Sequence, residues 1–149
     1  MNTETKTDAL AGFKFKVEID VAWGDMDAMS HVNNTRYLNY METARIEFFS
    51  HFFDELAGVG SATMTNGLAL AEVRCRFKVP LTYPDRVIVC CAVGQMDEDQ
   101  FMVVQEIYST KMGCVAAEGD GRMVCYDYVN MRRTLMGDEL RAKLEAFKL

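Results

Sequence analysis

Hydrophobic and polar residues follow two different periods in the first part of the chain. Residues 14–22 alternate between polar and apolar side chains, which is the period of a half-buried strand. In residues 34–54 the apolar side chains recur at steps of three and four, which is the period of a helix. The apolar stripe of this helix consists of Tyr37, Tyr40, Met41, Ala44, Phe48 and Phe52. Because apolar residues cover well over half of its circumference, we expect a curved sheet to wrap around the helix.

The remainder of the chain predicts four strands and a short helix. The predicted strands are residues 68–79, 86–93, 101–108 and 114–128, and the later part of the first alternates between apolar and charged residues. Residues 56–67 are rich in Gly, Ser, Thr and Asn and predict a loop that could gate a pocket. Asp138 is expected to cap a terminal helix. The late connections have hairpin lengths, which indicates an antiparallel sheet, and we therefore predict a single α+β domain.

A polar segment joins the first strand to the long helix. Residues 24–31 have no hydrophobic period, and their Gly, Asp and Ser residues favour turns. Asn33 and Asn34 follow, with side chains that can accept a hydrogen bond from a free N–H at a helix start. Asp27 stands seven residues before Asn34, so its carboxylate and the free N–H groups of the first helical turn can face one small volume. We take this junction as the candidate site.

The junction also carries the run W-G-D-x-D-x-x-x-H-V-N-N-T-x-Y-x-x-Y-x-E-x-A-R-x-E-F-F, over about a fifth of the chain. This run resembles the signature of the hotdog-fold acyl-CoA thioesterases of the 4-hydroxybenzoyl-CoA thioesterase-like family, which have acyl-ACP thioesterases as relatives. The resemblance implies a hotdog fold, in which a curved antiparallel sheet wraps around a long central helix. It also implies hydrolysis of an acyl-CoA thioester to a free acid and CoA.

By this resemblance, Asp27 matches the catalytic carboxylate and the N–H of Asn34 matches the group that polarises the thioester carbonyl. The carboxylate would attack the carbonyl carbon or deprotonate an attacking water. In the alternative interpretation, Asp27 only stabilises a turn or the helix dipole. His31 resembles an assisting histidine of the acyl-ACP branch, but Met29 stands where that branch has asparagine, so a packed, hydrogen-bonded loop histidine is the alternative.

Other polar residues near the junction have structural and binding interpretations. Asn33 is first a helix cap and second a substrate-binding amide. Asp25 is expected to bond loop N–H groups, and Arg45 is expected to form a buried pair with Glu42. The arginines that we consider for the phosphates of CoA are Arg86, Arg132 and Arg133, with solvated surface as the alternative.

Length, charge and residue usage limit the classes of protein to which this chain can belong. The 149 residues suit one domain, residues 1–149, with residues 1–12 as a flexible N-terminus. A net charge of −6 disfavours nucleic-acid binding, and the absence of a long apolar run argues against membrane insertion, so we expect a cytoplasmic protein. The five cysteines are expected to be buried, reduced thiols. Two histidines without ligand spacing predict no metal site, and no cofactor motif is present.

Two functions other than acyl-CoA hydrolysis stay open at this stage. The carrier could be acyl-ACP instead, although the acidic chain argues against docking an acidic carrier protein. The second open function is that of a hotdog module that binds an acyl ligand without turnover. A dehydratase is disfavoured because the histidine-proline motif of dehydratases is missing. A curved sheet that does not close into a barrel exposes its edge strands. We therefore expect a homodimer or homotetramer with active sites at the subunit boundary. The sequence does not define the acyl chain.

Overall fold

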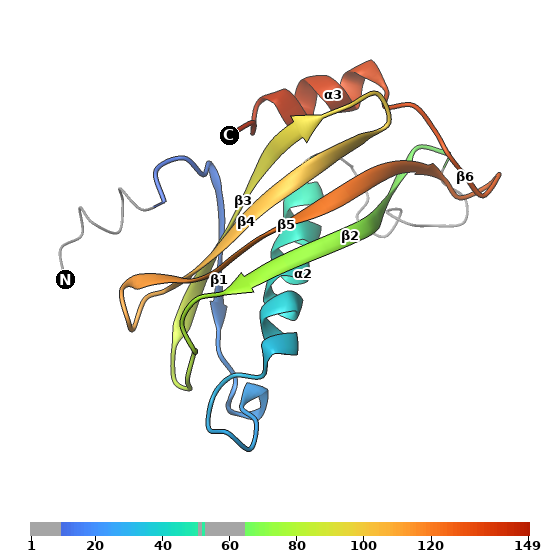
Figure 1. Ribbon diagram of the computed structural model, residues 1–149. Helices are drawn as coiled ribbons and strands as arrows, with labels where there is room; N and C mark the ends of the chain where they lie inside the picture. The colour runs from blue at the N-terminus through green and yellow to red at the C-terminus, as the bar shows by residue number, and fades with distance from the viewer. Residues whose placement is uncertain (1–9, 51, 53–64) are drawn as a thin grey trace.

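The computed structural model describes residues 10–50, 52 and 65–149, and these residues form one antiparallel sheet with a long helix against one face (Figure 1). The strands are β1 (Phe15–Asp20), β2 (Gly67–Phe77), β3 (Arg86–Met96), β4 (Gln100–Ser109), β5 (Cys114–Asp127) and β6 (Arg132–Arg133). The helices are η1 (Trp23–Asp25), α2 (Asn34–Phe49) and α3 (Asp138–Glu145). The six-stranded sheet has the order β1-β3-β4-β5-β2, with β6 paired to β5. The predicted α+β hotdog architecture is confirmed.

The long helix packs through its aromatic stripe, as the sequence predicts. Its buried residues are Tyr37, Tyr40, Met41, Ala44, Arg45, Phe48 and Phe49. The helix ends at Phe49, earlier than predicted, and Phe52 is a buried residue of the turn that follows. Because α2 lies against β1, β3 and β4, it leaves much of β2 uncovered. The predicted gating loop lies largely outside the described residues.

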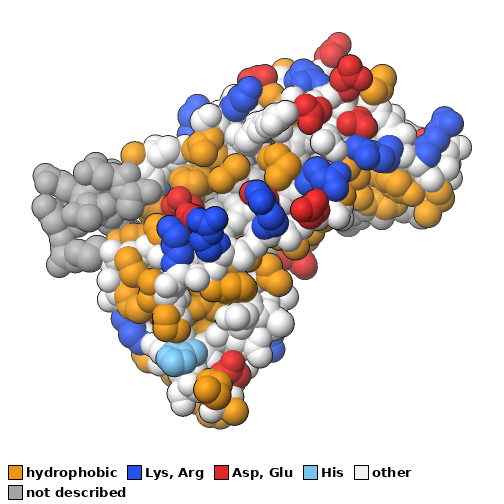
Figure 2. Space-filling view, viewed as in Figure 1, with side chains coloured by type: hydrophobic (Ala, Val, Ile, Leu, Met, Phe, Trp, Pro, Cys, Tyr) orange, Lys and Arg blue, Asp and Glu red, His pale blue; other side chains and the backbone are white. Residues whose placement is uncertain are grey.

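The two faces of β2 have opposite character, and the predicted alternation is confirmed. Its basic residues lie on the outer face of the sheet, where they form ion pairs with acids of β5: Arg74 with Asp120, and Arg76 with Glu118. Lys78, the residue after the strand, pairs with Glu118 as well. Figure 2 shows charged side chains of both signs gathered across this face. The outer face also packs Leu10 and Phe13 against Ile88, Cys90, Ala92 and Tyr108. Leu10 thus lies packed within the stretch expected to be flexible, while residues 1–9 are not described.

Two of the predicted local contacts are wrong. Arg45 is buried, but Glu42 is exposed and no ion pair joins them; the guanidinium instead donates a 3.1 Å hydrogen bond to Gln105 on β4. The side chain of Gln105 in turn donates to the carbonyl of Met41, so the buried charge is held by an amide that the sequence does not reveal. Asp138 is the first residue of α3 rather than its cap, because Gly137 occupies the N-cap position.

The cysteines only partly follow the prediction. Cys90, Cys91 and Cys125 are buried free thiols, whereas Cys75 and Cys114 are half-buried. Burial raises the pKa of the Cys90 and Cys91 thiols to about 12. Within the part of the chain that the structure describes, no helix is both long and apolar enough to cross a membrane.

Candidate active site

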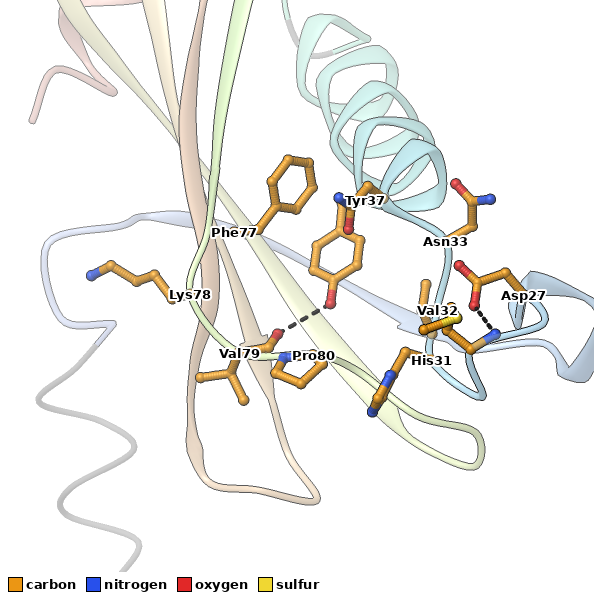
Figure 3. Close-up of a pocket in the computed structure, with 11 residues that line it drawn as sticks. Asp27, His31, Val32, Asn33, Tyr37, Phe77, Lys78, Val79 and Pro80 are labelled. Atoms are coloured by element: carbon orange, nitrogen blue, oxygen red, sulfur yellow. Dashed lines mark hydrogen bonds between the residues drawn. The ribbon is translucent and has the colours of Figure 1, made fainter.

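A pocket of about 420 Å³ opens between the start of α2 and the end of β2 (Figure 3). One wall is the loop before α2 with the first helical turn, and the other is the end of β2 with the chain that leaves it. The lining residues are Asp27, Met29, His31, Val32, Asn33, Asn34, Tyr37, Phe77, Lys78, Val79 and Pro80. Asp27, His31, Asn33 and Asn34, which the sequence places at one junction, therefore share one pocket.

The loop that carries Asp27 is closed by its own backbone. The N–H of Asp27 donates a 2.9 Å hydrogen bond to the carbonyl of His31, and the N–H of Ser30 donates to the carbonyl of Asp27 at 3.1 Å. Ser30 has a φ of 64°, the left-handed conformation that such a tight reversal requires. The N–H of Val32 bonds the carbonyl of Leu81 at 2.8 Å, which ties the loop to the opposite wall.

One oxygen of the Asp27 carboxylate is committed to the loop and the other is open. Oδ1 accepts a 2.9 Å hydrogen bond from the N–H of Met29. Oδ2 has no hydrogen-bond partner among residues 10–50, 52 and 65–149. The residue is exposed, and Figure 3 shows its carboxylate close to Asn33 at the helix start. The turn-stabilising role is thus real, and it leaves Oδ2 available to a substrate or a water.

The start of α2 presents a free donor to the same pocket. Oδ1 of Asn33 accepts 2.9 Å hydrogen bonds from the N–H and from the hydroxyl of Thr35, which confirms Asn33 as the N-cap. The N–H of Arg36 bonds the carbonyl of Asn33 at 2.8 Å. The N–H of Asn34 has no acceptor within the described residues, as expected for the first position of a helix. An oxygen bound there would also lie at the positive end of the helix dipole.

His31 lines the pocket without engaging the acid. Its side chain is exposed and forms no hydrogen bond with the residues that the structure describes, so the packed loop histidine is not observed. Figure 3 shows the ring turned away from the Asp27 carboxylate. An assisting role for His31 remains a prediction.

Tyr37 connects the two walls of the pocket, a role that the sequence does not show. Its hydroxyl accepts a 2.8 Å hydrogen bond from the N–H of Leu81 and donates one of 3.1 Å to the carbonyl of Val79. Burial raises the pKa of Tyr37, and the hydrogen bond from the N–H of Leu81 opposes that rise. Sequence reasoning assigned Tyr37 to the core and missed the wall of residues 77–80. The only local signal was Pro80, which marks a turn at the end of a strand.

Asp25 fastens the loop that carries Asp27 to the helix. Its Oδ2 accepts hydrogen bonds from the hydroxyl of Tyr40 at 2.7 Å and from the N–H of Ala22 at 2.9 Å, and its Oδ1 lies 3.7 Å from Arg36. The N–H of Asn33 bonds the carbonyl of Asp25 at 2.9 Å. Burial, and then the Asp25 carboxylate, raises the pKa of Tyr40 far above its ordinary range. The expected structural role of Asp25 is confirmed.

The predicted phosphate-binding arginines do not gather around the pocket of their own chain. Arg86 bonds Asp20 through Nε at 2.7 Å and lies beside a separate pocket. Tyr126 pairs with both Gly67 and Arg133, whereas Phe77 at the pocket pairs with Ala117. The ten residue steps along β2 from Gly67 to Phe77 therefore place Arg133 roughly 30 Å along the sheet from the pocket. Among the described residues that line the pocket, Lys78 is the one Lys or Arg, and it bonds Glu118 at 3.2 Å.

Comparisons with known proteins agree with this geometry. The family model of the thioesterase-like superfamily matches residues 21–144. The long-chain acyl-CoA thioesterase FadM of Escherichia coli is 24% identical over 130 residues, which cover 87% of this chain and 96% of that protein. A thioesterase from Thermus thermophilus, solved with coenzyme A and zinc, is similar with a TM-score of 0.80 and 25% identity, over 92% of this chain and 96% of its own.

A further solved structure confirms the fold. The DHNA-CoA thioesterase of Staphylococcus aureus superposes with a TM-score of 0.76 at 19% identity, over 89% of this chain and 91% of its own. No group of three or more His, Cys, Asp or Glu side chains within the described ranges could hold a metal ion. With the family model matched from the residue after β1 to α3, the chain belongs to the thioesterase-like superfamily and is a thioester hydrolase with the hotdog fold.

Proposed function

We propose that the chain hydrolyses an acyl-CoA thioester to a free acid and CoA in the pocket between α2 and β2. The observation that carries this proposal is the meeting of an open carboxylate oxygen, Oδ2 of Asp27, with an open donor, the N–H of Asn34, in one pocket. The similarity to FadM and to a thioesterase solved with coenzyme A supports the choice of acyl-CoA.

The proposed mechanism divides the work between these two groups. The thioester oxygen accepts a hydrogen bond from the N–H of Asn34, and the helix dipole stabilises the negative charge that develops on it. Asp27 either takes a proton from a water whose oxygen attacks the carbonyl carbon, or attacks that carbon itself to give an anhydride that water then hydrolyses. The C–S bond breaks in both routes, and the CoA thiolate leaves and is protonated. Tyr37 and Asp25 hold the two walls and the loop in place.

The test is hydrolysis of a panel of acyl-CoA thioesters by wild type and by Asp27→Asn. Removing the carboxylate is expected to lower kcat by about 10²–10⁴-fold, the range of general-base catalysis. Asp138→Asn, an exposed acid at the start of α3, is the matched control and should keep the wild-type rate. Equal rates for Asp27→Asn and wild type would remove Asp27 from the mechanism.

An acyl-ACP substrate is the second candidate, because His31 lines the pocket as the resemblance to the acyl-ACP branch implies. Competition decides between the two carriers. Free CoA should inhibit turnover of an acyl-CoA substrate if the pocket is built for CoA, and should leave turnover unchanged if the carrier protein provides the binding energy. A third outcome, recovery of an intact acyl ligand after long incubation, would indicate a binding module without turnover.

We also propose that the chain acts as a homodimer, or as a pair of such dimers, with each active site at the subunit boundary. The support is the edge strand β2, which has β5 as its only partner strand in the described sheet. Such an open edge is a template for pairing with a second strand. Sedimentation of the wild-type chain checks this assembly.

A further inference from the structure

Arg45 brings a positive charge into the core with no carboxylate beside it. The side chain lies on the buried face of α2 and is 5% exposed. Among the residues that the structure describes, the guanidinium forms one hydrogen bond, from Nη1 to the amide of Gln105, and no ion pair. Burial lowers the pKa of Arg45, yet an arginine stays charged at neutral pH. The guanidinium thus keeps donors for an anionic partner, and its burial is costly without one.

A glycine of β5 shows where the end of the Arg45 side chain lies. Gly121 pairs with Val73 of β2, and its missing side chain would point towards α2. A Cβ at this glycine would lie 3.9 Å from Cδ of Arg45 and 3.1 Å from Cδ1 of Leu70. Both side chains therefore lie over Gly121, and the end of the Arg45 side chain adjoins β2.

The part of β2 that Arg45 adjoins is apolar and uncovered. On the helix-facing side of this strand, Leu70, Val73 and Phe77 form an apolar strip, and they are 43%, 37% and 42% exposed. Phe77 also lines the pocket, and Figure 3 shows its ring directed towards α2 while Lys78 points away. The apolar strip is therefore continuous with the pocket at one end and reaches Arg45 towards the other.

We propose that the acyl group of the substrate lies along this strip and that Arg45 binds a carboxylate at its far end, so that the substrate is the CoA thioester of a dicarboxylic acid. The proposal rests on the acyl-CoA function argued above and adds the chemical class of the acyl group. A carboxylate accepts two parallel hydrogen bonds from a guanidinium and supplies the counter-ion that Arg45 lacks within the described ranges. The apolar strip contacts the methylene groups between the two ends.

The spacing along β2 sets the length of the acyl group. Val73, opposite Gly121, lies four residues before Phe77, which is roughly 13 Å along the strand. Long side chains of a helix point towards its N-terminus, so the guanidinium of Arg45 is directed to the pocket end of α2. An acyl chain of medium length therefore spans the distance from the thioester to the guanidinium. We expect suberoyl-CoA and sebacoyl-CoA to fit better than the shorter succinyl-CoA.

The test compares acyl-CoA substrates of equal length with and without the terminal carboxylate. For the wild-type chain, kcat/KM for sebacoyl-CoA should exceed that for decanoyl-CoA by about tenfold or more, as expected for hydrogen bonds between charged groups. Arg45→Met replaces the guanidinium with an apolar side chain and should remove this preference, whereas Arg45→Lys keeps the charge and should retain part of it. Arg76→Met, on the outer face of β2, is the matched control and should keep the wild-type ratio.

The contrary results are distinct from a failure of the proposed reaction. Equal kcat/KM for sebacoyl-CoA and decanoyl-CoA in the wild-type chain overturns the proposal without any variant. The wild-type ratio in a folded Arg45→Met chain overturns it as well, because Arg45 then serves only its bond to Gln105. A preference for a terminal hydroxyl over the terminal carboxylate also contradicts it, since a neutral group is then recognised. Failure to hydrolyse any thioester of the panel contradicts the reaction instead.

Discussion

The hydroxyl of Tyr40 donates a 2.7 Å hydrogen bond to the carboxylate of Asp25, two residues before the proposed catalytic Asp27. This bond joins the second turn of α2 to the loop, and the backbone of Asp25 in turn receives the N–H of Asn33 at the helix cap. The acid and the helix N-terminus are therefore held relative to each other by these two contacts of Asp25. The arrangement of the pocket follows from these contacts as much as from the groups that line it.

Replacement of Tyr40 by phenylalanine tests the positioning role of this bond. The variant is expected to lose about 1–2 kcal/mol of unfolding free energy, since it leaves a partly buried carboxylate oxygen with one partner fewer. It should also lower kcat more than it raises KM, because the loop moves relative to the helix. Urea unfolding and steady-state kinetics measure both effects. Tyr83→Phe, at an exposed tyrosine, is the control, and a Tyr40→Phe enzyme with wild-type kcat would mean that the bond has no positioning role.

The buried pair of Arg45 and Gln105 predicts a non-additive double variant. Gln105→Leu removes the acceptor of the guanidinium and should destabilise the protein by about 3–5 kcal/mol, because it leaves a buried charge without its partner. Adding Arg45→Met removes that charge and should restore much of the lost stability. The free energies of unfolding of the two single variants and the double variant form the test. Additive losses would show that the two side chains act independently.

Gly119 on β5 allows the close approach of β2. A Cβ at this position would collide with the carbonyl oxygen of Arg74 and lie 3.2 Å from the side chain of Met41. Gly119→Ala is therefore expected to lower the unfolding free energy by about 1–3 kcal/mol through overpacking. Gly24→Ala, where a Cβ meets nothing within 4 Å, is the control and should stay within about 0.5 kcal/mol of wild type. A neutral Gly119→Ala variant would mean that β2 can move away from β5 without loss.

The buried thiols predict a loss of stability in alkali. Burial raises the pKa of Cys91 to about 12, whereas a thiol in the unfolded chain titrates near 8.5. The unfolded state therefore loses its protons first, and the stability that is complete below pH 8.5 falls as the pH rises towards 12. The slope should be about 1.4 kcal/mol per pH unit for each such thiol. Urea unfolding between pH 8 and 11 measures it, and Cys91→Ala should be less steep than wild type.

The residue periods and the local chemistry were sufficient to predict the helices and strands, and one of the two walls of the pocket. The helical period defined the buried face of α2, the alternation defined the two faces of β2, and the asparagine before the helix proved to be its cap. Asp27, His31 and Asn34 could be placed together because they are close in sequence, and their positions are fixed by one turn and one helix start.

The contacts that could not be predicted from the sequence are those between segments far apart in the chain. Gln105 bonds Arg45 from 60 residues away, and nothing in the period of either element distinguishes this acceptor from the nearer Glu42. The second wall of the pocket, at Val79 and Pro80, depends on where β2 ends in space. The cap of α3 was misplaced because Asp138 and Gly137 are both acceptable N-cap residues, and only the backbone decides between them.

The most direct test of the pocket chemistry is the comparison of Asn34→Pro with Asn34→Ala. Proline is accepted at the first position of a helix, and Asn33 already has a φ of −59° and a ψ of 136°, which suits a residue before proline. The proline variant therefore removes the N–H proposed to polarise the thioester carbonyl and keeps the helix, whereas the alanine variant keeps that N–H. We predict a 10²–10³-fold lower kcat for Asn34→Pro with an unchanged circular dichroism spectrum, and near-wild-type kcat for Asn34→Ala. A folded Asn34→Pro enzyme with the kcat of wild type would contradict the account.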